Sequence, residues 1–322
     1  MQRRHFIELL GAAGLAATLG CARVLPPLRI AAYPWPGYEF LFLGRQEGWF
    51  TAEEVHLIET ASATDSLARL AAGEVDGAAL TLDEVLRARE QGLPLMMVLV
   101  FDVSVGADVV MARPEIRTLA DLKGRGIGYE SSGTGALMLH KLLAVADLDK
   151  KEVQLLALTP DQYLAAWQAR QVDALITYDP TATQLLDRGA QVLFNSSRLP
   201  DTIFDVLAVL PAAADRHAAA LHRLVAAHFQ GLANFRKNPL DSAYRLSGRM
   251  GLPPREVIGS FKGMELPGVL RNHQFLATPG GLIHERAPEV AAILRQAGIL
   301  QQPSLDLRRL ASADFLPREA LL

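Results

Sequence analysis

The segment LRIAAYPWPGYEFLFLGRQEGWF, residues 28–50, shows the unit from which the chain is built. Leu28–Ala32 is short and mostly apolar and leads into Pro34-Trp35-Pro36-Gly37, a sequence typical of a strand that enters a rigid turn. Residues 38–50 follow the turn and are predicted to form a helix. The segment therefore predicts a strand, a turn and a helix in succession.

The same alternation of strands and helices extends to residue 101. The run LMMVLVF, residues 95–101, is apolar throughout, as expected of a strand buried on both faces. A second series of the same kind covers residues 126–188, and helices follow beyond residue 208. Strands that alternate with helices predict an α/β fold, with parallel sheets joined by right-handed crossovers.

A faint internal repeat supports a division into two parts. Leu67, Leu70, Val75, Asp76 and Ala78 recur 97 positions later as Leu164, Trp167, Val172, Asp173 and Leu175. Two similar α/β lobes would produce this repeat, although helix–turn–strand units also resemble one another by chance. At about 150 residues per domain, a chain of 322 residues also predicts two domains.

The composition is that of a globular protein. Hydrophobic residues make up 50% of the chain and charged residues 21%, which excludes a disordered chain, a collagen and a coiled coil. The formal net charge of −3 provides no general basic field, so nucleic acid is not an expected partner. The single cysteine, Cys21, excludes a disulfide within the chain.

The first 21 residues have the order of a signal peptide. Arg3 and Arg4 precede an uncharged run over residues 9–19, whose 11 residues are too few for the about 20 that cross a bilayer. Residues 2–7 resemble a twin-arginine export signal, with general secretory export as the alternative.

Thr18-Leu19-Gly20-Cys21 resembles the lipobox of bacterial lipoproteins. This resemblance implies that Cys21 is the lipidated first residue of the mature protein, that residues 22–27 form a tether, and that the body is held at a membrane in the periplasm. A plain cleaved signal with a spare cysteine is the alternative.

Candidate ligand-binding residues follow the predicted strands, because ligands of open α/β sheets lie outside the carboxyl ends of the strands. The loops at these positions contain hydroxyls, aromatic rings and carboxylates but no Lys or Arg. The candidates are Trp35, Tyr38, Thr81, Ser104, Ser131, Ser132, Gly133, Thr134, Tyr178, Asp179 and Asp205.

Several candidates also have structural interpretations. Trp35 could stack on a ligand or cover the edge of the core. Ser131–Thr134 could hold an anion or a carbonyl oxygen at a helix start, or simply cap that helix. Asp179 could accept hydrogen bonds from a ligand or cap the next helix, and Asp205 fits a structural role as well as a binding one.

Catalytic and metal chemistry are not indicated. The predicted mature chain has no cysteine beyond Cys21, and its histidines include no H-x-x-x-H pair. The chain has no G-x-S-x-G elbow and no phosphate-binding loop of the G-x-x-x-x-G-K type. We therefore predict no catalytic residue, no metal and no cofactor.

Several segments taken together resemble a known family. Leu28-Arg29-Ile30-Ala31, Trp35-Pro36-Gly37-Tyr38 and Gly48-Trp49-Phe50 come first, followed by residues 119–134 and by Asp179-Pro180. In this order they resemble the nitrate/sulfonate/taurine-type periplasmic binding proteins, which include the binders of thiamin pyrimidine precursors. The resemblance covers about residues 28–210.

The resemblance implies a type II-like periplasmic binding protein fold with two lobes, each a mainly parallel sheet flanked by helices. Lobe 1 would comprise residues 28–108 and 209–322, and lobe 2 residues 109–208, with two hinge crossings near 106–110 and 205–209. A monomer of this kind closes on a small molecule and delivers it to the permease and ATPase of an ABC importer. It is a binding protein rather than an enzyme.

The expected ligand follows from the loops. A sulfonate or nitrate usually needs a nearby cation, which these loops do not provide. Trp35 and Tyr38, with Asp179 and the hydroxyls, favour a small nitrogen-containing compound that is pyrimidine- or amine-like. The alternatives are a sulfonate or nitrate binder, a pyrimidine-synthase- or desulfinase-like enzyme on the same fold, and a sensor that docks on a membrane receptor.

Overall fold

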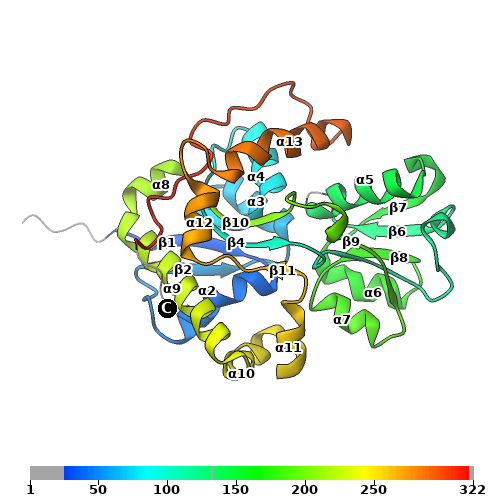
Figure 1. Cartoon of the computed structure of the whole chain (residues 1–322), viewed down its shortest axis with the longest axis horizontal. Helices are drawn as coiled ribbons and strands as arrows, with labels where there is room; N and C mark the ends of the chain where they lie inside the picture. The colour runs from blue at the N-terminus through cyan, green and yellow to red at the C-terminus, as the bar shows by residue number, and fades with distance from the viewer. Residues whose placement is uncertain (1–24, 132, 319–322) are drawn as a thin grey trace, which may run out of the picture.

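The computed structural model describes residues 25–131 and 133–318. The predicted signal peptide, the lipid attachment at Cys21 and the start of the tether lie outside these residues. Two β-sheets, each covered by helices, make up two lobes that lie side by side (Figure 1). We call the lobe that begins with residue 28 lobe 1 and the other lobe 2. The predicted two-lobed α/β architecture is confirmed.

The sheet of lobe 1 has the strand order β11-β4-β10-β3-β1-β2. Parallel pairs join β1 to β2 and to β3, whereas β10 is antiparallel to β3 and β4. The predicted apolar strand is β4, and every one of its residues is buried. The strands are β1 (Leu28–Ala32), β2 (Val55–Glu59), β3 (Gly77–Thr81), β4 (Met96–Ser104), β10 (Phe204–Val209) and β11 (Met264–Glu265).

The sheet of lobe 2 has the order β7-β6-β8-β5-β9. Here β6 is parallel to β7 and β8, and β5 is antiparallel to β8 and β9. Each sheet is therefore mixed, with a parallel part of three strands. The strands are β5 (Val109–Ala112), β6 (Gly126–Tyr129), β7 (Gln154–Ala157), β8 (Ala174–Thr177) and β9 (Gln191–Asn195).

Helices follow the parallel strands, and the C-terminal helices pack on lobe 1 (Figure 1). Within the described residues, no helix is both long and apolar enough to span a membrane. The helices are α2 (Glu39–Gln46), α3 (Ala63–Ala71), α4 (Leu82–Glu90), α5 (Thr134–Ala146), α6 (Tyr163–Gln168), α7 (Thr181–Leu186), α8 (Pro211–Arg216), α9 (Ala218–Lys237), α10 (Pro239–Met250), α11 (Pro254–Ser260), α12 (Val269–Leu276) and α13 (Leu282–Gln296).

The second crossing between the lobes differs from its expected place. Strand β10 pairs with β3 and β4 along its whole length, so residues 204–208 lie in the sheet of lobe 1 and not in lobe 2. The chain therefore crosses back before β10, over residues 196–203, rather than within 205–209. The sequence could not show this, because an apolar strand next to a crossing suits either sheet equally well.

Candidate functional site

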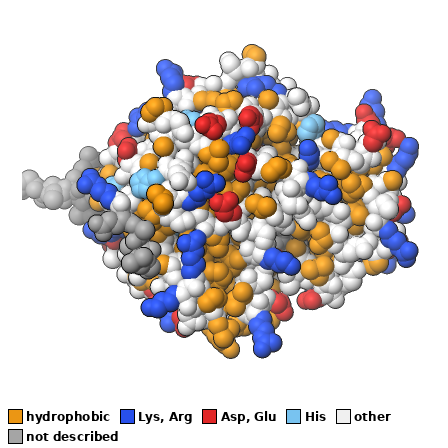
Figure 2. Space-filling view, in the orientation of Figure 1, with side chains coloured by type: hydrophobic (Ala, Val, Ile, Leu, Met, Phe, Trp, Pro, Cys, Tyr) orange, Lys and Arg blue, Asp and Glu red, His pale blue; other side chains and the backbone are white. Residues whose placement is uncertain are grey.

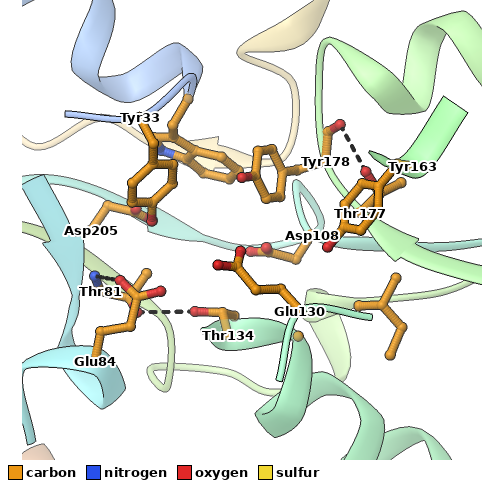
Figure 3. A pocket seen from close by; sticks show the side chains of 13 residues that line it. Tyr33, Thr81, Glu84, Asp108, Glu130, Thr134, Tyr163, Thr177, Tyr178 and Asp205 are labelled. Atoms are coloured by element: carbon orange, nitrogen blue, oxygen red, sulfur yellow. Dashed lines mark hydrogen bonds between the residues drawn. The ribbon is translucent and has the colours of Figure 1, made fainter. Parts of the chain in front are cut away.

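The strands of both sheets bring their adjoining loops to one cavity between the lobes (Figure 3). Its volume is about 20 Å³, which is room for about one water molecule, so the lobes are closed over it. Lobe 1 supplies Tyr33, Trp35, Thr81, Glu84 and Asp205, and the lobe 2 side supplies Asp108, Glu130, Thr134, Gly135, Tyr163, Ile176, Thr177 and Tyr178.

Trp35 forms part of the aromatic wall. Its backbone lies in the turn after β1, where the prolines on both sides limit its freedom. The indole Nε1 donates a hydrogen bond of 2.9 Å to Asp102 Oδ2. The indole ring meets Tyr178 of lobe 2 edge to face, with ring centroids 5.1 Å apart. Trp35 thus both lines the cavity and fills the boundary between the lobes.

Tyr38 lies behind this wall and does not line the cavity, contrary to its prediction as a ligand contact. Its hydroxyl donates to Asp205 Oδ1 at 2.5 Å and lies 3.2 Å from the hydroxyl of Tyr33. Tyr38 therefore positions Asp205. The turn between Trp35 and Tyr38 depends on Gly37, because a Cβ there would lie 1.9 Å from Asp102 Oδ2.

Asp102 and Asp205 form a buried carboxyl pair at the end of the lobe 1 sheet. They are in register on the antiparallel strands β4 and β10, and both are almost fully buried. Burial raises the pKa of Asp102 to about 8. Burial, together with the nearby charges of Asp102 and Asp108, raises the pKa of Asp205 well above its usual range.

A second group of acids surrounds the same space. Burial raises the pKa of Asp108 to about 7. Burial and the charges of Asp83 and Glu130 raise the pKa of Glu84, whose carboxylate also accepts a hydrogen bond from the backbone N–H of Thr81. Within the described residues, no Lys or Arg side chain lines the cavity. The site is therefore acidic and aromatic.

Hydrogen bonds between the lobes close the rim of the cavity. The Thr134 hydroxyl at the start of α5 lies 3.0 Å from Thr81 Oγ1 and 3.1 Å from Asp83 Oδ1. Glu130 Oε1 accepts from the backbone N–H and the hydroxyl of Thr64, at 3.1 and 2.7 Å. These contacts join residues that follow β2 and β3 in the lobe 1 sheet, or end β3, to residues that follow β6 in the lobe 2 sheet.

The start of α5 faces carboxyl groups rather than space for an anion. A Cβ at Gly133, the residue before this helix, would lie 2.8 Å from Glu84 Oε1 and 3.5 Å from the carboxyl carbon of Glu130. Helix N-termini favour negative charge, and here the protein's own acids provide it. The expectation of a bound anion at residues 131–134 therefore finds no support in this geometry.

The candidates that line the cavity are Trp35, Thr81, Thr134, Tyr178 and Asp205. Three of the other described candidates, Ser104, Ser131 and Asp179, lie elsewhere, each for a local reason. The Ser104 hydroxyl bonds to Ser196 Oγ at 2.7 Å, beside the hinge. Ser131 is exposed, and its carbonyl accepts from Arg87. Asp179 caps α7 by accepting from the Thr183 N–H. Ser132 lies outside the described residues.

Sequence reasoning missed several lining residues. Tyr33, Asp108 and Glu130 each lie in a loop beside a strand, so their positions gave a signal that was not used. Glu84 and Tyr163 lie within the first turns of α4 and α6, inside segments predicted as helix, and only the folded chain shows which way they face. In the described part of the chain, no group of three or more His, Cys, Asp or Glu could hold a metal ion.

The face of the molecule seen in Figure 2 shows no dominant charge. On the face seen in Figure 2, Lys and Arg side chains are scattered among acidic and apolar ones.

Two lobes joined by two crossings, with a cavity between their strand ends, define the periplasmic binding protein fold. The fold matches the alkanesulfonate-binding protein SsuA from Xanthomonas axonopodis pv. citri bound to MOPS, with a TM-score of 0.74, 20% identity and coverage of 88% of this chain and 98% of that chain.

Residues 35–242 match the NMT1/THI5 like family, and the chain belongs to this family. A putative aliphatic sulfonates-binding protein from Escherichia coli is 27% identical over 225 residues, 69% of this chain and 70% of the relative. A putative thiamine biosynthesis protein from Haemophilus influenzae is 30% identical over 151 residues, 45% of this chain and 46% of the relative.

Proposed function

We propose that this protein is the extracytoplasmic solute-binding component of an ABC importer. It captures a small molecule between its lobes and presents the closed form to a permease and its ATPase. The cavity supports this proposal, because both lobes contribute to its walls and both contribute hydrogen bonds to its rim. Hinge closure on a ligand requires this kind of two-sided site.

The ligand that the walls suit best is a small nitrogen-containing compound, pyrimidine- or amine-like. The single observation that carries this preference is a lining of aromatic rings and carboxyl groups, with no Lys or Arg among the described lining residues. Carboxyl groups accept hydrogen bonds from N–H donors, and aromatic rings pack against flat or cationic groups.

A sulfonate or similar oxyanion is the second candidate, because the E. coli relative is named for aliphatic sulfonates. Against this candidate, an anion placed in the cavity would face the carboxyl groups of Asp108, Glu130 and Asp205 without a compensating side-chain cation. An enzymatic role on the same fold is a third candidate. We place it last, because the described lining residues include no Cys and no His.

A thermal-shift screen tests the ligand class. A ligand that binds only the folded chain raises the melting temperature through RT ln(1 + [L]/Kd). We expect stabilisation by compounds from a set of aminopyrimidines and primary amines. Stabilisation by taurine, nitrate or MOPS, with none by pyrimidines or amines, would overturn the preference for nitrogen compounds and favour the oxyanion candidate. Turnover of a stabilising compound, followed by mass spectrometry, would instead indicate an enzyme.

We further propose that the protein is exported and lipid-anchored, as residues 1–21 suggest. Cleavage before Cys21 and acylation of its thiol would leave only residues 22–27 between the lipid and β1, a span of about 25 Å at most. Mass spectrometry of the mature chain from membranes tests this anchor. A Cys21→Ser variant should move to the soluble periplasmic fraction, and unchanged membrane association would refute the lipid anchor.

A further inference from the structure

We propose that the captured molecule is a compact organic cation with N–H donors, a protonated amine or amidine, and that its charge is what allows the two lobes to close. This inference rests on the proposed solute-binding function and narrows the ligand class. It begins from the way in which closure distributes the carboxyl groups of the two lobes.

Acids of both lobes meet in the closed form. Asp83, Glu84 and Asp205 belong to lobe 1, and Asp108 and Glu130 belong to the lobe 2 side. All five are buried, with exposed fractions of 1% for the first three and 6% for the last two. Closing the lobes therefore removes water from two sets of acids, and all of them except Asp83 line the one small cavity.

No positive side chain compensates for this inside the cavity, among the residues that the structure describes. A basic group outside the cavity lining, Arg87 on α4, donates to the carbonyl of Ser131 at the rim, and its charge acts on Asp83. Asp102 also faces the acids through its pairing with Asp205, and burial raises its pKa to about 8. Four phenols face them too, and burial raises their pKa values, so they stay neutral: Tyr33, Tyr38, Tyr163 and Tyr178.

The cavity also presents acceptors that lack donors. Asp205 Oδ2 and Asp108 Oδ2 are buried and have no hydrogen-bond partner within the described chain, and the same holds for the Tyr178 hydroxyl. All three residues line the cavity and approach it from different sides, as Figure 3 shows. An unpartnered buried carboxyl oxygen needs a donor, and two of them, one on β10 of lobe 1 and one in the first crossing between the lobes, need a ligand that donates in two directions.

These two requirements define the ligand. A cation without N–H groups supplies charge only, a neutral amide supplies donors only, and an anion supplies neither. A protonated amine or amidine supplies both. It needs the lobes further apart than in this structure, where the cavity has room for about one water molecule and the rings of Trp35 and Tyr178 are in contact. In the absence of such a cation, protons on the carboxyl groups must provide the neutralisation, so the ligand-free protein should close more readily at low pH.

The test uses three probes of nearly the same shape: acetamidinium, acetamide and acetate, each at 10 mM, at pH 8 and matched ionic strength. Tetramethylammonium serves as the cation without donors. We expect acetamidinium to raise the melting temperature and to reduce the radius of gyration in small-angle X-ray scattering, with at least tenfold weaker effects from the other three. Equal effects from acetamide or acetate, or none from acetamidinium, would overturn the cation inference.

Variants test which carboxyl groups are responsible for binding acetamidinium. Asp108→Asn and Asp205→Asn should each lower the apparent affinity for acetamidinium at least tenfold. Asp187→Asn, the same change at an exposed position after α7, should leave the affinity unchanged. Without any probe, lowering the pH from 8 to 5 should compact the wild-type protein, and Asp108→Asn should reduce this response. Compaction that is independent of pH would contradict the role of charge in closure.

The outcomes also separate this inference from the function on which it rests. If a neutral pyrimidine closes the lobes as well as acetamidinium does, solute capture stands and the cation inference fails. If no probe and no member of the wider screen, of any charge, stabilises or compacts the protein, both fail.

Discussion

Asp102 on β4 lies directly opposite Asp205 on β10, 103 positions later in the chain, and the two carboxyl groups are buried together at the end of the lobe 1 sheet. Each has an aromatic donor: the Trp35 Nε1–H for Asp102 and the Tyr38 hydroxyl for Asp205. The turn of residues 34–38 thus holds a pair of acids that would otherwise repel each other. This pair and its surroundings lead to four predictions.

The first prediction concerns stability against pH. Burial raises the pKa of Asp102 from 3.8 to about 8, so between these pH values the folded chain binds a proton that the unfolded chain lacks. The free energy of unfolding should therefore decrease as the pH rises from about 4 to about 8. Asp102→Asn cannot ionise and keeps an oxygen for Trp35. At pH 8 it should be more stable than the wild type by on the order of 5 kcal/mol.

Urea unfolding from pH 5 to pH 9 measures this effect. The curve of Asp102→Asn should be flatter than that of the wild type, and Asp187→Asn should follow the wild type. Parallel curves for wild type and Asp102→Asn would show that Asp102 ionises normally.

The second prediction concerns Gly37. An added Cβ would overlap Asp102 Oδ2, so Gly37→Ala should destabilise the protein by about 1–3 kcal/mol and shift the carboxyl pair. Gly248→Ala in α10 is the matched control. A Cβ there meets nothing within 4 Å, and alanine in a helix should stabilise by about 0.5–1 kcal/mol. Thermal unfolding of both variants checks these opposite signs, and a Gly37→Ala variant as stable as the wild type would disprove the close contact.

The third prediction concerns the rim between the lobes. Thr134→Val removes the hydroxyl that bonds to Thr81 and Asp83 across the cleft. Losing a hydrogen bond of about 0.5–1.5 kcal/mol from the closed form alone should weaken ligand affinity by up to about tenfold. Thr134→Ser keeps the hydroxyl and should restore the affinity. Calorimetric titration with the compound found in the screen measures both variants; if serine fails to rescue, packing rather than the hydroxyl closes the rim.

The fourth prediction concerns His228, which is fully buried against the rings of Phe40, Phe101 and Phe229. Burial lowers the pKa of His228 from 6.5 to about 3, so on the acid side the unfolded chain binds a proton that the folded chain does not. Stability should be lost as the pH falls from about 6.5 toward 3. At pH 4 this loss amounts to about 3 kcal/mol.

His228→Leu should lack this acid-side loss, since leucine does not titrate. His56→Leu, at an exposed position of β2, should lose as much stability as the wild type does when the pH falls. Denaturant unfolding at pH 4 and pH 7 provides the comparison. An equal loss in wild type and His228→Leu would mean that this histidine does not contribute to acid sensitivity.

Local patterns predicted much of the fold. The apolar run over residues 95–101 became β4, and the turn at Trp35 ends β1 as expected, because burial on both faces and proline geometry depend only on nearby residues. The antiparallel placement of β5 and β10 was not predictable, because pairing partners are chosen across the whole chain. The predicted end of lobe 2 at residue 208 was wrong for the same reason, since β10 pairs with strands of lobe 1.

The site was predictable to a similar extent. Trp35, Thr81, Thr134 and Tyr178 follow strands, and they line the cavity. The full concentration of acids could not be seen in the sequence, because Asp102 meets Asp205 only through the pairing of β4 with β10, and Glu130 joins them only when the two lobes close. A count of charges along the chain gives nearly balanced totals of 35 acidic and 32 basic residues and hides this local imbalance.

The small volume of the cavity determines the order of events in ligand exchange. The closed form leaves about 20 Å³, little more than one water molecule needs, and both lobes share hydrogen bonds at its rim. Ligand molecules must therefore arrive at and leave from an open form. The rate of opening then sets an upper limit on the dissociation rate constant, and the residence time of a bound solute becomes a property of the hinge as much as of the contacts made with the ligand.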